Sequence, residues 1–454
     1  MAEPARRRPS LWLEQVDGAL PSRPPLDGDA DVDVAIVGAG YTGLWTAYAL
    51  LANDPQLRVL LVERDHVGFG ASGRNGGWCV GELAGHPPPG LARAIADTVD
   101  EVGRVTAVEG IDCGFVKGGV IRLARTEPQR RRQETEVGEW RALGFGSDDV
   151  RLLDTDEARQ RLRATNVLGG LFFAPAARVQ PARLAHGLAA AVERRGGRIV
   201  ESTAVTDIVA GSATARPSLR TARGHVRADT VVVATEAYTR DLPGGRRRLA
   251  PVYSLMIATE PIAEERWADI GLAEREVFAD DRRMVIYGQR TVDDRLAFGG
   301  RGAPYRFGSG IDPATEQSSR IHARIEETLR ELLPALDGVE VTHRWGGVLG
   351  VPRDWRPGVG VDRETGIAWA GGYVGEGVAA ANLAGRTLAD LVTGADSDLT
   401  RMTWVGHRSR PWEPEPLRWL AINGVRLLAG WIDDREERSG TTPRLASALE
   451  RLVR

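Results

Sequence analysis

The sequence contains few of the residues that several common classes of site require. Cys79 and Cys113 are its only cysteines, too few for a disulfide framework or a four-cysteine metal site. Lys117 is its only lysine, so a base or Schiff base built on an amine has almost no candidate. Neither a cluster of metal ligands nor a G-x-S-x-G motif occurs. We therefore expect neither a metal site nor a hydrolytic triad.

Long apolar runs and an excess of one charge are also missing. No apolar run approaches the roughly eighteen residues of a membrane span. The formal net charge is only -3, which gives no strong field for nucleic acid. The basic N-terminus is not followed by an apolar segment. These features favour a cytoplasmic protein with no transmembrane segment and no nucleic-acid partner. The length of 454 residues favours two or more domains.

The strongest positive pattern lies between residues 33 and 63. An apolar run at 34–37 has the composition of a strand buried on both faces. It leads into G-x-G-x-x-G at 38–43, then an amphipathic helix over 44–51 and a second apolar strand over 57–62. The order strand, glycine turn, helix, strand is the context that such a motif needs. It predicts a dinucleotide site rather than a merely structural turn.

Each conserved feature of such a unit has a physical role here. Gly38 permits a tight turn, Gly40 lets the backbone approach a pyrophosphate, and Gly43 lets the helix pack close to the strand. The helix N-terminus offers free N–H groups to the phosphates. Glu63 ends the second strand and is placed to accept hydrogen bonds from an adenosine ribose.

A second glycine-rich stretch follows at 68–78. Its small side chains allow many backbone N–H groups to come close to a ligand. A flexible linker is the alternative, but Phe69 and Trp78 are unusual in a linker. We interpret the stretch as a loop that touches the cofactor.

The rest of the chain alternates between helical and strand patterns. We expect a largely helical region over 91–165 with a strand pair at 115–123, a helix over 180–195, and a buried strand over 226–235. Period-two alternation between 248 and 345 predicts an antiparallel sheet covered by a helix at about 315–333. A strand, glycine turn and helix recur over 367–370, 371–377 and 378–393, and an apolar helix over 417–432 lies in the tail. Trp419, Ile422, Leu427 and Trp431 in that helix suit a membrane surface or a partner, although packing on the body is the expected role.

This series of motifs resembles the D-amino-acid oxidase (DAO) superfamily of FAD enzymes. The stretches 70–77, 258–261 and 298–301 are similar to the branch of gamma-glutamylputrescine oxidase, near glycine and sarcosine oxidases. The resemblance spans about 10–395 and leaves the tail uncovered.

The resemblance implies an α/β fold, α+β in its second domain. An FAD-binding, Rossmann-like three-layer domain would be interleaved with a substrate domain built on an antiparallel sheet. The implied boundaries are an N-terminal arm (1–30), an FAD-binding domain (31–90, 176–247 and 346–396), a substrate domain (91–175 and 248–345) and a C-terminal helical tail (397–454).

The resemblance also implies FAD as the cofactor, held without a covalent bond because neither cysteine lies in the late segment where sarcosine oxidases attach it. The residues implied to hold FAD are Gly38, Gly40, Tyr41, Thr42, Gly43, Glu63, Arg64, Ala71, Ser72, Arg74, Asn75, Gly76, Val205, Ala234, Thr235, Gly372, Tyr373, Gly375, Gly377 and Val378.

The candidates for catalysis and substrate binding come from the antiparallel sheet. The catalytic candidates are Tyr253, Tyr287, His343 and Trp345, and the substrate-binding candidates are Arg290 and Arg301. Period two places Tyr287 and Gln289 on one face and Arg290 on the other. An arginine on the flavin side would hold a substrate carboxylate through two hydrogen bonds. The alternative for each candidate is an ordinary sheet residue.

The reaction implied is oxidation of a C–H bond next to an amine nitrogen, with an amine or amino acid as substrate and oxygen as acceptor. Two departures from the family keep another acceptor open. Gly375-Glu376-Gly377 stands where many relatives carry Gly-His-Gly, and 248–345 contains no lysine of the kind that sarcosine oxidases use to activate oxygen. The alternatives are an FAD dehydrogenase that reduces a quinone or a protein, and a flavin-bearing subunit of a larger assembly docked through the tail.

Overall fold

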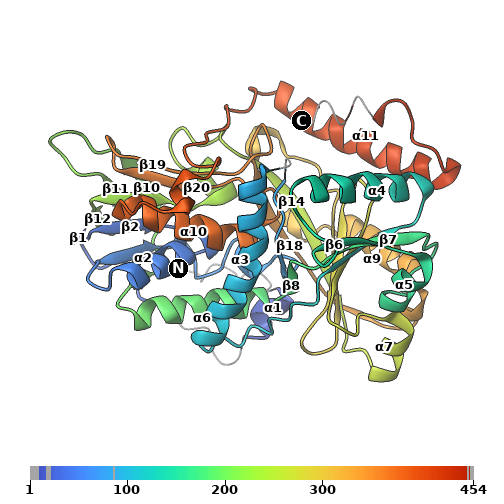
Figure 1. Ribbon diagram of the computed structural model, residues 1–454. Helices are drawn as coiled ribbons and strands as arrows, with labels where there is room; N and C mark the ends of the chain where they lie inside the picture. Colours follow the sequence, from blue (N-terminus) through green and yellow to red (C-terminus); the bar gives the residue numbers. More distant parts are fainter. Residues whose placement is uncertain (1–9, 17–21, 85–86, 447–448, 450–454) are drawn as a thin grey trace.

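The computed structural model describes residues 10–16, 22–84, 87–446 and 449. Residues 1–9 and 17–21 of the expected arm lie outside this part. Two large sheets, one of six strands and one of eight, dominate the architecture (Figure 1). The first carries the dinucleotide-binding turn, and the second faces it.

The six-stranded sheet has the order β19-β20-β13-β2-β3-β9 and is parallel except at β19. Its strands are β2 (Val34–Val37), β3 (Val59–Val62), β9 (Arg198–Val200), β13 (Thr230–Val233), β19 (Gly358–Asp362) and β20 (Ile367–Gly371). β2 and β3 are buried throughout, as expected for parallel strands covered on both faces.

Helices cover one face of this sheet and a small sheet covers the other. The helices are α2 (Tyr41–Asn53), α3 (Pro89–Val108), α6 (Pro181–Arg194) and α10 (Gly377–Thr393). The small sheet consists of β1 (Ala30–Asp31), β10 (Val205–Val209), β11 (Ser218–Thr221) and β12 (Gly224–Arg227). Leu219 and Val226 of the small sheet pack on Leu60 of β3. The result is a three-layer, Rossmann-like arrangement.

The eight-stranded sheet has the order β18-β14-β17-β16-β15-β5-β7-β6. Its strands are β5 (Val120–Ala124), β6 (Val150–Leu153), β7 (Gly169–Phe173), β14 (Ala250–Thr259), β15 (Val277–Asp280), β16 (Ile286–Arg290), β17 (Leu296–Arg301) and β18 (Val341–Val351). It is antiparallel except where β5 and β15 run parallel.

The two faces of this sheet pack against different parts of the protein. Tyr253, Leu255 and Ile257 of β14 pack in the core under α9 (Ser319–Leu332). Met256, which alternates with them, packs on the other side with Trp345. That second side faces the flavin loop, which we define as residues 68–77.

The remaining elements lie at the edges. They are α1 (Leu11–Glu14), α4 (Glu127–Ala142), α5 (Thr155–Arg161), α7 (Glu264–Ile270), α8 (Pro313–Glu316) and α11 (Leu417–Ser439), with β4 (Trp78–Val80) paired to β8 (Ala176–Arg178). The apolar residues of α1, Leu11 and Trp12, are buried in the body as expected. Within the described residues, no helix combines the length and the apolar character needed to cross a bilayer.

Several predicted elements differ from the observed ones. The strand pair predicted at 115–123 is wrong, because only β5 forms there and Val116 makes a single bridge to Arg178. Gly119 has a φ of 81°, which interrupts any strand before Val120. The strand predicted over 226–235 is divided between β12 and β13, because the chain changes sheet at residues 228–229.

Candidate active site

The glycine turn between β2 and α2 is closely packed on three sides. Gly38 has a φ of 103°, and a Cβ on it would lie 2.8 Å from the carbonyl oxygen of Ala234. A Cβ on Gly43 would lie 2.1 Å from the carbonyl oxygen of Gly38. A Cβ on Gly40 would lie 3.0 Å from Ser72 Oγ in the flavin loop. The turn therefore leaves room for a ligand only because these positions lack side chains.

Glu63 closes the same turn from β3. Its carboxylate accepts hydrogen bonds from the N–H of Ala39 at 2.8 Å and of Asp65 at 2.9 Å. Burial raises the pKa of Glu63, and the two backbone donors oppose that shift. The carboxylate is thus fixed in direction beside the cavity, which suits an acceptor for ribose hydroxyls.

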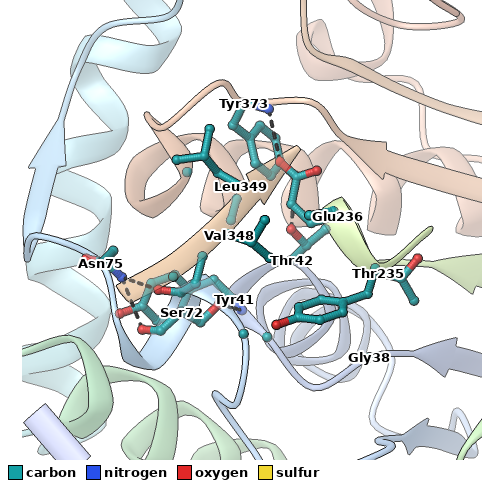
Figure 2. A pocket seen from close by; sticks show the side chains of 18 of the residues that line it. Gly38, Tyr41, Thr42, Ser72, Asn75, Thr235, Glu236, Val348, Leu349 and Tyr373 are labelled. Carbon is teal, nitrogen blue, oxygen red and sulfur yellow. Dashed lines mark hydrogen bonds between the residues drawn. The ribbon is translucent and has the colours of Figure 1, made fainter. Parts of the chain in front are cut away.

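The flavin loop is held in shape by its own side chains. Asn75 Nδ2 donates to the carbonyl oxygens of Ala71 and Ser72, and Asn75 Oδ1 accepts from the N–H of Gly77. Ser72 Oγ accepts from the N–H of Tyr41 at 2.9 Å, which ties the loop to the N-terminus of α2 (Figure 2). The backbone of the loop is thereby presented to the cavity with little freedom.

Arg74 anchors the loop to the eight-stranded sheet. Its guanidinium donates to Glu316 at 2.8 Å and to Tyr238 Oη at 3.0 Å, and it lies over the ring of Phe69. Arg74 and Glu316 are both almost completely buried. The buried pair joins the flavin loop to α8 next to the cavity.

A second helix N-terminus enters the cavity from the turn between β20 and α10. Tyr373 Oη lies 3.1 Å from Thr42 Oγ1, so this turn touches the start of α2 (Figure 2). Gly377 and Val378, the first residues of α10, line the cavity together with Glu376. Two helix N-termini therefore meet one enclosed space, an arrangement that stabilises negative charge.

Glu236 is an acid beside this turn that sequence reasoning missed. Its φ is 44°, and its carboxylate accepts from the N–H of Gly372 at 3.2 Å and of Tyr373 at 3.3 Å. Burial raises the pKa of Glu236 to about 7, with the two N–H donors acting against the shift. Its position after the last residue of β13 was the only signal in the sequence, since binding residues gather at the carboxyl ends of parallel strands.

The cavity continues onto the eight-stranded sheet. Ser254 of β14 and Tyr287 of β16 line it and share a hydrogen bond of 2.6 Å between their oxygens. Leu349 of β18 adds apolar surface (Figure 2). Val348, also in the lining, pairs with Tyr253, and its side chain packs in the core under α9. The dinucleotide turn and the sheet thus contribute to one cavity.

Most of the residues predicted to hold a cofactor line this cavity. They are Gly38, Gly40, Tyr41, Thr42, Glu63, Arg64, Ala71, Ser72, Arg74, Asn75, Gly76, Val205, Ala234, Thr235, Tyr373, Gly375, Gly377 and Val378. Gly43 and Gly372 lie behind the lining. Lining residues that the sequence analysis did not propose include Glu236, Tyr238, Ser254, Val348 and Leu349.

The catalytic candidates are not brought together. Tyr287 lines the cavity, whereas Tyr253 lies on the opposite face, where its hydroxyl bonds to the backbone of Asp312. Trp345 is buried behind the flavin loop and donates to the carbonyl oxygen of Arg74. His343 contacts Glu14 at 2.9 Å at the rim of the sheet. Only Tyr287 of the four therefore stays in our candidate site.

The two substrate-binding candidates also lie differently from each other. Arg290 points away from Tyr287 and Gln289, as period two predicts, and is held by Glu264 and Asp294 over the ring of Trp267. It is absent from the cavity lining. The backbone of Arg301 pairs with Ser254, but its side chain lies outside the described part of the chain.

The residues present fit an FAD molecule. Glycines at the points of close approach, an oriented acid after β3 and two helix N-termini facing one cavity are the donor set for a dinucleotide with two phosphates. The cavity extends beyond them to the face of the eight-stranded sheet. The fold and site thus define a dinucleotide-binding protein with further enclosed space beside the dinucleotide turn.

Comparison with known proteins identifies the family. The sequence profile of the DAO family, FAD dependent oxidoreductase, matches residues 33–391, and the chain belongs to that family. Gamma-glutamylputrescine oxidoreductase from Escherichia coli is 30% identical over 375 residues, covering 80% of this chain and 84% of the relative. Glycine oxidase from Geobacillus kaustophilus is 28% identical over 373 residues, covering 79% of this chain and 92% of the relative.

The fold agrees with solved structures. Glycine oxidase from Geobacillus kaustophilus superposes with a TM-score of 0.72 at 24% identity, covering 83% of this chain and 99% of that chain. L-Proline dehydrogenase from P. horikoshii superposes with a TM-score of 0.70 at 18% identity, covering 82% of this chain and 96% of that chain. At such identities the likeness concerns the fold alone. The protein is therefore an FAD-dependent oxidoreductase with the fold that the motif series implied.

Proposed function

We propose that the protein oxidises a C–H bond next to an amine nitrogen, giving an imine that water hydrolyses to a carbonyl compound. The carrying observation is the single cavity that joins the dinucleotide turn to the face of the eight-stranded sheet. The named relatives, an oxidoreductase of a putrescine derivative and a glycine oxidase, support an amine nitrogen in the substrate.

FAD supplies the acceptor for two electrons in this reaction. The chain contributes binding and electrostatics around it. The N-terminus of α2 and the backbone of the flavin loop bind the diphosphate, and the N-terminus of α10 faces the other end of the cavity. The apolar side chain of Leu349 excludes water from the reacting end.

Tyr287 and Ser254 are the groups proposed to orient the substrate. Their hydroxyls form a bonded pair at the sheet end of the cavity, where the substrate would lie. A reaction of this kind requires correct placement of the C–H bond more than an acid–base triad.

The charges around the cavity favour an amine over an amino acid. The described lining includes four acids and two arginines: Glu63, Glu236, Asp241, Glu376, Arg64 and Arg74. Both arginines already pair with carboxylates, Arg64 with Asp65 and Asp241, and Arg74 with Glu316. Neither is therefore available as a clamp for a substrate carboxylate.

Oxygen is the proposed electron acceptor, and a quinone or a protein is the second candidate. One observation favours the second: Lys117, the single lysine, pairs with Asp100 and is absent from the cavity lining. A lysine-based device for oxygen activation thus has no residue in this cavity.

An anaerobic screen tests the proposal. Purified holoprotein is mixed with a panel of amines, N-alkyl amino acids and α-amino acids, and loss of the oxidised flavin absorbance is recorded. We expect amines to bleach the flavin, and to do so faster than amino acids of equal size. Recolouring within seconds of admitting air would indicate an oxidase, and slow recolouring a dehydrogenase. A flavin that no member of a broad panel bleaches would contradict the proposal.

The variant Tyr287→Phe examines the orienting pair. It removes one hydrogen bond, so we expect the rate of flavin bleaching to fall about tenfold or more with unchanged FAD content. Tyr305→Phe is the matched control, because Tyr305 is a buried tyrosine that bonds to Glu415 and lies outside the cavity lining. Equal rates in the two variants would remove Tyr287 from the site.

A further inference from the structure

The C-terminal helix α11 has one face on the body and one face in solvent. Figure 1 shows it along the upper edge of the molecule, beside α4. On its inner side, Ile432 is fully buried and Glu436 pairs with Arg132 of α4. On its outer side, Leu417, Leu420, Leu427 and Trp431 are 58%, 56%, 63% and 45% exposed. The outer side is therefore an apolar surface exposed to water, contrary to the expectation that the whole helix packs on the body.

The outer residues form one regular stripe. Leu417, Leu420, Gly424, Leu427 and Trp431, which we call the α11 stripe, alternate in steps of three and four. This is the a/d spacing of a helix that packs along another helix. Among the described residues the stripe carries no charge.

The two arginines in this half of α11 turn toward the body. Arg418 Nη1 donates to the carbonyl oxygen of Arg246, and Arg426 Nη1 donates to that of Gly302. The cations are thus removed from the outer face. A helix exposed on its own would gain from the opposite arrangement, with the charges in water and the leucines inside.

The stripe is nearly symmetric about Gly424. Leu417 and Trp431 lie seven residues to either side, while Leu420 lies four residues before Gly424 and Leu427 three residues after it. A second α11 running antiparallel would set Leu417 against Trp431 at both ends and glycine against glycine at the centre. Glycine at a crossing lets two helix axes approach closely, and a surface that matches itself under a two-fold rotation is the requirement for a symmetric dimer.

We propose that α11 docks on the α11 of a second copy of this chain, antiparallel, with the two-fold axis at Gly424. The charged turns at 433–438 then extend past the partner stripe. An anionic membrane is disfavoured as the occupant, because acids and arginines are mixed in those turns and the outer face has no basic border. A single helix pair lies at the small end of specific interfaces, so the dimer dissociates at about micromolar concentration.

Sedimentation velocity over a dilution series tests the dimer on the full-length holoprotein. Wild type should change from dimer to monomer on dilution. Leu427→Arg should weaken association at least about 100-fold, since it places a cation in an apolar seam. Val108→Arg is the matched control, because Val108 is 65% exposed at the end of α3, and it should behave as wild type. FAD content reports that each variant is folded.

Cysteine cross-linking tests the geometry. Both native cysteines are buried, so a new surface cysteine is the accessible thiol. Gly424→Cys should form a disulfide-linked dimer on mild oxidation. Arg438→Cys, seven residues beyond Trp431 on the same side of the helix and about 21 Å from the axis, should stay unlinked in an antiparallel pair and would link in a parallel one.

Three results would overturn the proposal. The first is a wild type that stays monomeric at about 100 µM, well above the expected dissociation constant. The second is a dimer that Leu427→Arg leaves intact. The third is binding to lipid vesicles, zwitterionic or anionic, that Leu427→Arg abolishes while the protein remains monomeric, which would make a membrane the occupant.

Discussion

Replacing Glu236 with glutamine should change how the stability of the protein depends on pH. Burial raises the pKa of Glu236 from an ordinary 4.5 to about 7 in the folded chain. Between these values the folded state holds a proton that the unfolded state has released, so stability falls as pH rises from about 4.5 to about 7 and is level above. Glu236→Gln does not titrate and should not show this fall.

The magnitude follows from the shift. A difference of about 2.5 pH units corresponds to about 3.4 kcal/mol for a fully enclosed group. Because the cavity gives Glu236 partial access to water, we expect about 1–2 kcal/mol. At about 2 cal/mol/K of unfolding entropy per residue, this is a change in Tm of about 1–2 °C for the chain. Glutamine keeps one acceptor for the N–H groups of the β20–α10 turn. Any stability lost through these hydrogen bonds is therefore similar at every pH.

Thermal melts of the FAD-free protein at pH 5 to 8.5 measure this effect. The Tm of Glu236→Gln minus that of wild type should rise by about 1–2 °C between the two ends of the range. Glu265→Gln, a change at an exposed acid on α7, should leave the profile of wild type unaltered. Parallel profiles for wild type and Glu236→Gln would refute the reasoning, because they would show that Glu236 ionises with its ordinary pKa.

Three further changes have defined outcomes. Gly43→Ala puts a methyl group 2.1 Å from the carbonyl oxygen of Gly38, so the purified variant should contain little FAD per chain by absorbance; full occupancy would contradict the packing described for the turn. Arg74→Ala removes the buried guanidinium that donates to Glu316 and Tyr238, and it should lower the free energy of unfolding in urea by about 3–5 kcal/mol, whereas a loss below about 1 kcal/mol would mean that the pair is not enclosed. Burial raises the pKa values of the two cysteines, so neither should react with a thiol reagent in the native protein. Both should react fully after denaturation, and the flavin should be released into solution in the same step.

Local patterns predicted the dinucleotide unit well, for a physical reason. The turn at Gly38 to Gly43, its helix and the acid at Glu63 lie within one short stretch, and each is fixed by contacts among near neighbours. The part of the eight-stranded sheet that lies between 248 and 345 was also foreseen from its alternation, whereas β5, β6 and β7 were not. Period two tells which residues share a face, but it does not tell which face meets the cavity. Tyr253 was therefore chosen where its neighbour Ser254 is the lining residue.

Long-range contacts account for the other differences. Glu236 acquires its role from the N–H groups of Gly372 and Tyr373, which are far away in the sequence. Arg290 was predicted to bind a substrate carboxylate, but its guanidinium already pairs with Glu264 and Asp294. Neither fact is encoded in the pattern of residues near the site. The outer face of α11 is a further case. Its apolar residues predict a buried helix, but in the structure the body covers only one side of it.

The arm at Trp12 has a consequence for how the enzyme retains its cofactor. Trp12 Nε1 donates to the carbonyl oxygen of Asn75 in the flavin loop, and its ring meets that of Trp345 edge to face at 5.9 Å. Trp345 in turn donates to the carbonyl oxygen of Arg74. The loop is thus clamped between a segment 63 residues before Asn75 and one 271 residues after Arg74. Its final shape requires both segments, so a substitution at Trp12 would act on flavin retention rather than on the surface alone.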